Sequence, residues 1–141
     1  MTTHTNPNPP PYQTFTTYAG TPPLAASPWV YICSPYASDP EGNTARARGY
    51  CALALAAGRI PIAPHLYWPL FLDDTDPNQR AVGLALALED LARCREVWSF
   101  VPTTGPSTGM RGELAQARMR RMPVSWFDIE GAEIAPLPEF A

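Results

Sequence analysis

The chain has 141 residues, a length that fits one domain, and its formal net charge at pH 7 is −3. This near-balanced charge gives no electrostatic case for binding a nucleic-acid polymer or a membrane surface. All 10 basic residues are arginine, so the composition excludes mechanisms that need a lysine, such as a Schiff base or the lysine of a phosphate-binding P-loop.

The cysteines and the apolar runs bear on the cellular compartment in which the protein is expected. Cys33, Cys51 and Cys94 lie in apolar segments, and no two have the spacing of a zinc or redox pair. We therefore expect reduced thiols in a reducing compartment, the cytoplasm. No apolar run approaches the roughly 20 residues of a membrane span, and no signal peptide is expected at the N-terminus. His65 has no second ligand at metal spacing, so no metal site is predicted.

Residues 1–28 differ in composition from the rest of the chain. They contain three consecutive prolines from position 9, many threonines, and no Asp, Glu, Lys or Arg. This composition predicts a disordered, Pro/Thr-rich arm. Aromatic residues interrupt the arm, which leaves open a second interpretation, a proline-rich ligand for a partner protein.

From residue 29 on, short apolar runs alternate with helical patterns. The predicted elements are a strand at 29–33, a helix from 40 or 44 to 57, a strand at 60–63, a helix at 77–93, a strand at 96–101, a helix at 109–121 and a strand at 122–127. Pro61 suits an edge strand or a strand end. Asp76, followed by Pro77, is a good N-cap for the second helix. The loop at 64–74 is unusually apolar, so its aromatic side chains pack on the core or line a pocket.

This alternation predicts one Rossmann-like α/β domain over residues 29–127, with a parallel sheet of about four to five strands and a C-terminal tail at 128–141. Ligands of such sheets bind beyond the carboxyl ends of the strands. Three loops meet at that edge, at 34–43, 64–75 and 102–109.

Glu113 is the most unusual residue of the third helix. It shares a helix face with Met110, Leu114 and Ala117, which form an apolar stripe. A carboxylate in such a stripe needs a partner or a cleft, because burying it unpaired is costly. Two interpretations are open: a nucleophile or general base, or a glutamate on the rim of the stripe that stabilises the helix dipole.

Ser107 and Gly109 stand at the start of the same helix. Ser107 either caps the helix in the ordinary way or, with the neighbouring amides, faces an anion. Asp73 and Asp74 precede a helix that Asp76 already caps, so their default interpretation is solvated carboxylates, with a sugar hydroxyl or an arginine as alternatives. Three arginines, at 46, 48 and 80, flank the predicted crevice; each suits helix surface charge or a phosphate.

Seven short segments together resemble the nucleoside 2-deoxyribosyltransferase-like superfamily, and more narrowly a phage and bacterial branch labelled DUF4406 or DUF7768. The resemblance covers about residues 30–126. The matching segments are 30–36 (VYICSPY), Asn43 with Ala45, 50–51 (YC), 61–67 (PIAPHLY), 71–74 (FLDD), 94–98 (CREVW) and 107–113 (STGMRGE).

The resemblance implies a flavodoxin-like fold and cleavage of the N-glycosidic bond of a nucleoside or nucleoside monophosphate, with neither metal nor organic cofactor. It implies that Glu113 is the nucleophile, within a Ser-x-Gly-x-x-x-Glu segment whose serine contacts phosphate. The substrate contacts that we predict are Tyr31, Ser34, Tyr36, Asp74, Ser107, Gly109 and Met110. Relatives are often oligomers with sites near subunit interfaces, so a homo-oligomer is expected.

The sequence departs from this superfamily on the second helix. The aspartate that is common there falls at Ala87 in an ungapped match, and the aspartate that often precedes the third strand is Arg95. A second hypothesis is therefore a non-catalytic protein, of phage or mobile-element origin, that binds or sequesters a nucleotide. A third is an interaction module that uses the proline-rich arm to reach a host protein.

Overall fold

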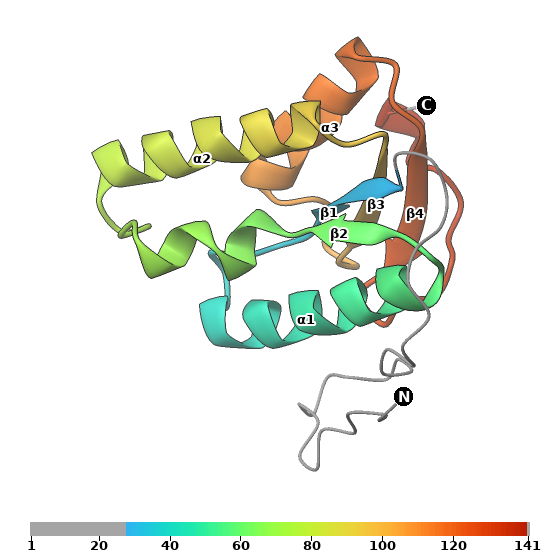
Figure 1. Cartoon of the computed structure of the whole chain (residues 1–141), viewed down its shortest axis with the longest axis horizontal. Helices are drawn as coiled ribbons and strands as arrows, with labels where there is room; N and C mark the ends of the chain where they lie inside the picture. The colour runs from blue at the N-terminus through green and yellow to red at the C-terminus, as the bar shows by residue number, and fades with distance from the viewer. Residues whose placement is uncertain (1–27, 141) are drawn as a thin grey trace.

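The computed structural model in Figure 1 describes residues 28–140. The predictions for the arm at 1–28 therefore lie outside the described residues, apart from Pro28. The main elements are β1 (Trp29–Cys33), α1 (Pro40–Ala56), β2 (Ile60–Ile62), α2 (Pro77–Ala92), β3 (Glu96–Val101), α3 (Thr108–Met119) and β4 (Val124–Asp128). Three short 3-10 helices are η1 (Pro64–Leu66), η2 (Trp68–Leu70) and η3 (Pro138–Phe140).

The four strands form one parallel sheet in the order β2-β1-β3-β4. This confirms the predicted α/β class, and the order matches that of flavodoxin-like folds. β2 lies at the edge and pairs with β1 alone, so Pro61 occupies the edge position that its missing N–H favours. The strand order reverses direction between β1 and β3, and this is where the fold opens a crevice for ligands.

Helices cover both faces of the sheet, as Figure 1 shows: α1 lies on one face, and α2 and α3 lie on the other. Successive strand side chains point to opposite faces. Val30 and Ile32 therefore pack in the cluster on the α1 side, whereas Tyr31 and Cys33 pack in the cluster that contains the buried residues of α2 and α3. Among the described residues, no helix has the length and apolarity needed to cross a membrane.

Capping residues set the helix ends. The Asp39 side chain accepts a hydrogen bond from the Gly42 amide, so α1 begins at residue 40 rather than 44. Asp76 caps α2 as predicted. The third helix ends at Met119, two residues earlier than predicted, because Arg121 adopts a left-handed conformation (φ 55°) that a helix cannot contain. The following strand accordingly starts at residue 124 instead of 122.

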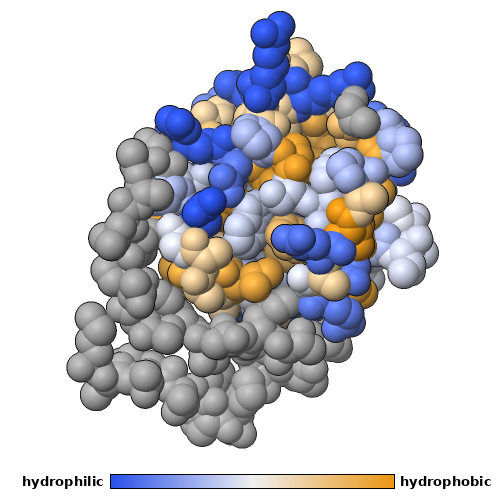
Figure 2. Space-filling model, turned by 90° about the vertical axis from the view of Figure 1, so that its right-hand side faces the viewer, coloured by the Kyte–Doolittle hydropathy of each residue, from blue (hydrophilic) through white to orange (hydrophobic). Residues whose placement is uncertain are grey.

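The C-terminal segment folds back on the sheet. The Ile134 amide donates to the Trp126 carbonyl at 3.0 Å, and Phe140 of η3 packs against the core cluster that includes Trp126. Arg118 of α3 donates to the Glu139 carbonyl at 3.4 Å. Figure 2 looks onto this side of the molecule and shows hydrophilic side chains gathered over the end of α3, at the top. Residues 129–140 are thus part of the packed domain.

The aromatic cluster on the α1 side generates a stability prediction. Phe100 is fully buried, and its ring centroid lies 3.7 Å from that of Tyr50 and 4.9 Å from that of Phe127. We expect Phe100→Ala to lower the free energy of unfolding by about 3–5 kcal/mol in urea titrations, because it leaves a cavity. Met119→Ala, at a side chain that is 76% exposed, is the control and should change it by less than about 0.5 kcal/mol. Equal effects of the two variants would contradict this account of the core.

Candidate functional site

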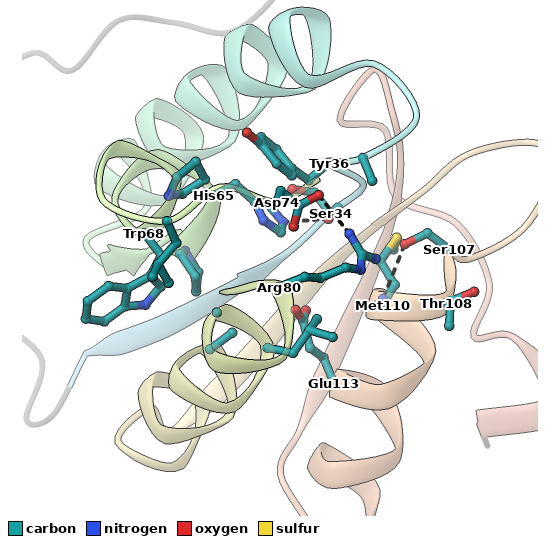
Figure 3. Close-up of a pocket in the computed structure, with 18 of the residues that line it drawn as sticks. Ser34, Tyr36, His65, Trp68, Asp74, Arg80, Ser107, Thr108, Met110 and Glu113 are labelled. Carbon is teal, nitrogen blue, oxygen red and sulfur yellow. Dashed lines mark hydrogen bonds and ion pairs between the residues drawn. The ribbon is translucent and has the colours of Figure 1, made fainter. Parts of the chain in front are cut away.

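A pocket of about 240 Å³ opens at the carboxyl ends of the strands. Its wall combines the residues that follow β1, the turns η1 and η2, the first half of α2 and the first turns of α3 (Figure 3). They include the ends of the three loop regions that follow β1, β2 and β3, which the strand order brings to the point where the sheet changes direction. The volume is slightly below the range of about 300–1,000 Å³ typical of drug-sized ligands.

All but one of the predicted site residues line this pocket. Those in the lining are Ser34, Tyr36, Asp74, Ser107, Gly109, Met110 and Glu113. Tyr31 is fully buried in β1 and does not reach the lining. Its side chain instead lies behind Glu113, close enough for the two groups to influence each other's pKa. A direct contact of Tyr31 with a ligand would therefore need movement of the pocket floor.

Glu113 forms the floor of the pocket on α3, where only 5% of the residue is exposed. Burial raises the pKa of this carboxyl to about 7, because the charged form loses its hydration. Hydrogen bonding from the Cys33 thiol and the Tyr31 hydroxyl acts in the opposite direction and lowers the pKa. By strict hydrogen-bond geometry, the Glu113 Oε2 atom and the Tyr31 hydroxyl have no partner, and the Cys33 thiol donates to the Met110 carbonyl oxygen at 4.0 Å. Near neutral pH the group can therefore exist as an acid or as a carboxylate.

The groups behind Glu113 stay protonated. Burial, and then the charge of Glu113, raise the pKa of Tyr31 and of Cys33 well above their ordinary values. Both can therefore only serve as donors toward the carboxylate. Ser99 of β3 pairs with Cys33 of β1 and lies on the same face of the sheet. Its contact with Cys33 acts against the other causes and lowers the pKa of the thiol. The apolar core thus carries a small polar cluster directly beneath the pocket.

The N-terminus of α3 forms one side of the pocket. Ser107 is the N-cap, and its Oγ accepts a hydrogen bond from the Met110 amide at 3.3 Å. Of the two interpretations from the sequence, the structure therefore shows the capping contact. The free amides of the first helical turn carry partial positive charge, which favours an anion near this end. The backbone is accessible here because Thr108 and Gly109 also line the pocket.

Two interactions order the opposite wall. The Arg80 Nη1 and Asp74 Oδ2 atoms form an ion pair at 2.7 Å. His65 Nε2 lies 2.6 Å from the Ser34 carbonyl oxygen, and its ring stacks on Tyr36 with the centroids 5.5 Å apart. Because a carbonyl only accepts, Nε2 carries the proton. Burial lowers the pKa of His65, although the Ser34 contact and the nearby Asp74 oppose this shift, so the ring is neutral at pH 7.

Several lining residues were not among the predicted site residues. His65 was considered only as a metal ligand, and for Arg80 helix surface charge and a phosphate contact were both left open, since a lone histidine and a helix arginine carry little signal by themselves. Trp68 comes from the apolar loop, whose composition did indicate either core or pocket. Of the other two arginines near the crevice, Arg46 pairs with Asp39 at 3.5 Å, and Arg48 is exposed on α1.

The structure also shows which residue occupies the position of the expected second carboxylate. Ala87 lines the pocket, so no acid faces it from this turn of α2. Asp90 lies one turn further along and accepts a hydrogen bond from Trp68 Nε1 at 2.8 Å. It is not part of the lining. Among residues 28–140, no group of His, Cys, Asp and Glu side chains could hold a metal ion.

Sequence comparison places the chain in a family. The profile of a domain of unknown function, DUF7768, matches residues 28–127. The chain belongs to the DUF7768 family. This confirms the branch that the sequence motifs indicated. A search of curated protein sequences gives no match.

Solved structures share the fold. One is a 2-deoxyribosyltransferase from Bacillus psychrosaccharolyticus, with a TM-score of 0.56 and 17% identity, over 76% of this chain and 77% of that chain. Another is a 2-deoxyribosyltransferase from Leishmania mexicana, with a TM-score of 0.52 and 17% identity, over 71% of this chain and 63% of that chain. The predicted 2-deoxyribosyltransferase-like fold is therefore confirmed for this DUF7768 chain.

The buried carboxyl makes the stability of the protein depend on pH. The pKa of Glu113 is raised from 4.5 to about 7 in the folded state, so the folded state holds the proton more tightly than the unfolded state does. Its contribution is fully present below pH 4.5 and is lost as the pH rises to about 7, by on the order of 3 kcal/mol. Glu113→Gln, which stays neutral, should therefore stabilise the protein at pH 8 and have little effect at pH 4.5.

Urea unfolding at the two pH values measures this difference. The control is Glu89→Gln, which removes an exposed carboxylate from α2 and should change stability little at either pH. If Glu113→Gln destabilised the protein at pH 8, the carboxyl would have a stabilising partner in the folded state, and the raised pKa would be wrong.

Proposed function

We propose that this protein cleaves or transfers the N-glycosidic bond of a nucleoside or nucleoside monophosphate, with Glu113 as the nucleophile. The observation that carries the proposal is a buried carboxyl with an unpartnered oxygen on the floor of a strand-end pocket. The fold is that of 2-deoxyribosyltransferases, enzymes that act on nucleosides. Burial without a partner is costly for stability, so a role in chemistry explains why the site contains a glutamate.

The proposed reaction has two steps. A Glu113 oxygen attacks the anomeric carbon and forms a glycosyl ester, while the bond from that carbon to the base nitrogen breaks. The base leaves with the electron pair of that bond and takes up a proton. Water, or a second base, then attacks the anomeric carbon, releases Glu113 as a carboxylate and gives the free sugar or the new nucleoside.

The rest of the pocket supports the steps of this reaction. Ser107 and the amides at the start of α3, such as that of Gly109, suit the phosphate or a sugar oxygen. The Met110 amide already donates to Ser107, so Met110 lines the pocket chiefly with its side chain. Tyr36, Asp74 and Ser34 on the facing wall suit hydroxyls of the sugar and the polar edge of the base. Tyr31 acts through Glu113, because a protonated hydroxyl beside the carboxylate favours its charged form and fixes its direction.

A second function is favoured by one observation, the side chain of Ala87 in the pocket wall. No carboxyl group faces the pocket from this turn of the helix, so the leaving base lacks an obvious proton donor there. The alternative is that the protein binds or sequesters a nucleotide without cleaving it. The same pocket would serve both functions, and turnover distinguishes them.

Release of free base tests the proposal. The protein is incubated with a panel of deoxynucleosides and their 5′-monophosphates, and the base is separated by chromatography. We expect release by the native protein and a loss of at least about 1,000-fold in Glu113→Gln, because the neutral amide cannot attack. The control Glu89→Gln should keep the native rate. Activity that survives in Glu113→Gln would contradict the mechanism, and binding by calorimetry without turnover would favour the sequestering function.

The pH dependence of the same assay reports on the nucleophile. Only the carboxylate form of Glu113 can attack, and its pKa is about 7. The rate under kcat/KM conditions should therefore rise as the pH increases through about 7 and level off above it. A rate that is unchanged between pH 5 and pH 7 would mean that Glu113 is fully ionised in this range.

We further propose that the protein forms a homo-oligomer, as the family resemblance implies. Tyr67, Leu70 and Phe71 beside η2 are between 54% and 73% exposed, an apolar surface near the pocket mouth that a second copy would cover. Light scattering after size-exclusion chromatography should give a mass of two chains or more, and Leu70→Ser should lower it. A monomer at all concentrations would contradict this proposal.

A further inference from the structure

The loop of residues 64–74 is tied to α2 at two points. Near the start of the loop, the Trp68 Nε1 atom donates a hydrogen bond to Asp90 Oδ2 at 2.8 Å. Near its end, the Asp74 carboxylate pairs with Arg80 at 2.7 Å. Arg80 belongs to the first turn of α2 and Asp90 to the last. The two ties therefore hold the loop along most of the length of the helix.

Small residues on α2 leave room for a ligand beside this loop. Gly83 and Ala87 follow each other by one turn on the face of α2 that lines the pocket. A Cβ atom placed on Gly83 would lie 3.6 Å from Leu72 Cδ1, so the loop and the helix are in contact there. A larger side chain at Ala87 would extend into the pocket. The loop thus forms a wall of the cavity and does not fill it.

Figure 3 shows that the pocket has two ends. Ser107 and Thr108 lie at one end, Trp68 lies at the other, and Glu113 lies between them. The end at α3 presents backbone amides and hydroxyl groups. Beside Trp68, the loop contributes three further apolar side chains to the lining, those of Pro64, Pro69 and Leu72. The two ends therefore suit different parts of one ligand.

The position of Glu113 between these ends determines how a nucleoside would lie. Attack by the carboxylate requires the anomeric carbon to lie close to the pocket floor. The sugar and the base then extend from that carbon toward opposite ends of the pocket. Sugar hydroxyls suit the polar end at α3, whereas a flat aromatic ring stacks well on an indole. The base is therefore expected at the Trp68 end.

The hydrogen bond to Asp90 fixes the orientation of the Trp68 ring. Trp68 also meets Tyr67 edge to face, with the ring centroids 4.8 Å apart, but Tyr67 is 54% exposed and restrains its neighbour weakly. A carboxylate is a strong acceptor for an N–H donor, and such a bond has a defined direction. The bond to Asp90 is therefore the main restraint on the rotation of the indole.

The ordinary roles of a helix carboxylate do not explain Asp90. It lies in the last turn of α2, where the negative end of the helix dipole disfavours an acid. No ion pair between residues 28 and 140 includes it. The hydrogen bond of its side chain goes to Trp68, a residue of the pocket lining.

We propose that Asp90 is a positioning residue, which holds the Trp68 indole as the platform on which the base of the substrate stacks. Asp90 does not line the pocket, so it acts through Trp68 and does not touch the ligand. The inference rests on the proposed function for the identity of the flat ring as a nucleobase. It adds that affinity for the base, but not for the sugar, depends on Asp90.

Binding of free bases tests the inference without relying on bond cleavage. The probes are adenine and thymine, which have a flat ring but no sugar, and 2-deoxyribose, which has no aromatic ring; each is titrated by calorimetry. We expect Asp90→Leu to weaken the binding of both bases about 10-fold, because the stacking platform is no longer held, and to leave the affinity for 2-deoxyribose unchanged. The matched control is Glu89→Leu, at the exposed carboxylate next to Asp90, which should bind all three probes like the native protein.

Further variants separate positioning from a general effect on the fold. Asp90→Asn keeps an oxygen that accepts the indole N–H, so its affinity for the bases should stay within about three-fold of the native value. Trp68→Phe keeps an aromatic ring but removes the N–H donor, and it should weaken base binding as Asp90→Leu does. The double variant should bind the bases no more weakly than either single variant, since both changes break the same hydrogen bond.

Three results would overturn the inference. These are base affinity that is unchanged in Asp90→Leu, an equal loss of affinity for 2-deoxyribose in that variant, and native protein that binds neither base. Each can occur together with base release that depends on Glu113, so failure of this inference is distinct from failure of the proposed function. Conversely, base binding that depends on Asp90, without any base release, would support the inference and contradict the glycosidic mechanism.

Discussion

The burial of one carboxyl group on the apolar stripe of α3 is the constraint on which the site depends. Met110, Leu114 and Ala117 must face the sheet to complete the core, and Glu113 lies among them. The core tolerates this acid in two ways: a raised pKa lets it hold its proton, and protonated donors on β1 contact it from below. The raised pKa favours the neutral form and so limits the cost of burial, whereas the donors favour the charged form, so both forms are accessible near pH 7.

The sheet topology determines which groups can meet that carboxyl. Because β1 and β3 lie side by side at the change of direction, the residues after each of them reach the same crevice, and the turns after β2 close it. The two walls differ in character. The α3 side offers backbone amides and a hydroxyl, whereas the α2 side offers a neutral imidazole and an ion pair. An extended ligand with an anionic end and a polar ring suits such a pocket better than an apolar one.

Local patterns predicted the fold well, whereas contacts between distant segments were beyond them. The structural roles of Asp76 and Pro61 can be predicted from the residues next to them in the sequence, and both occupy the expected positions. The end of α3 and the start of β4 were misplaced because the backbone of Arg121 is left-handed, which no pattern of side chains indicates. In the site, the apolar stripe identified Glu113. The sequence could not show that Tyr31 lies behind it, because the position of a buried side chain depends on the packing of β1 against α3.

The Arg80–Asp74 pair shows why composition alone leaves a site incomplete. In the sequence, Asp74 was a predicted substrate contact and Arg80 suited helix surface charge or a phosphate, but no pattern identified these two side chains as a pair. The structure adds that the two side chains pair at 2.7 Å in the wall of the pocket that Ser34 and the start of α3 also line. A chain without lysine has only arginine as a permanently cationic side chain, and among the described residues the pocket lining contains a single one, Arg80. The arginine of the pocket wall and the buried carboxyl of the pocket floor lie on different helices, so either group can be substituted without removing the other.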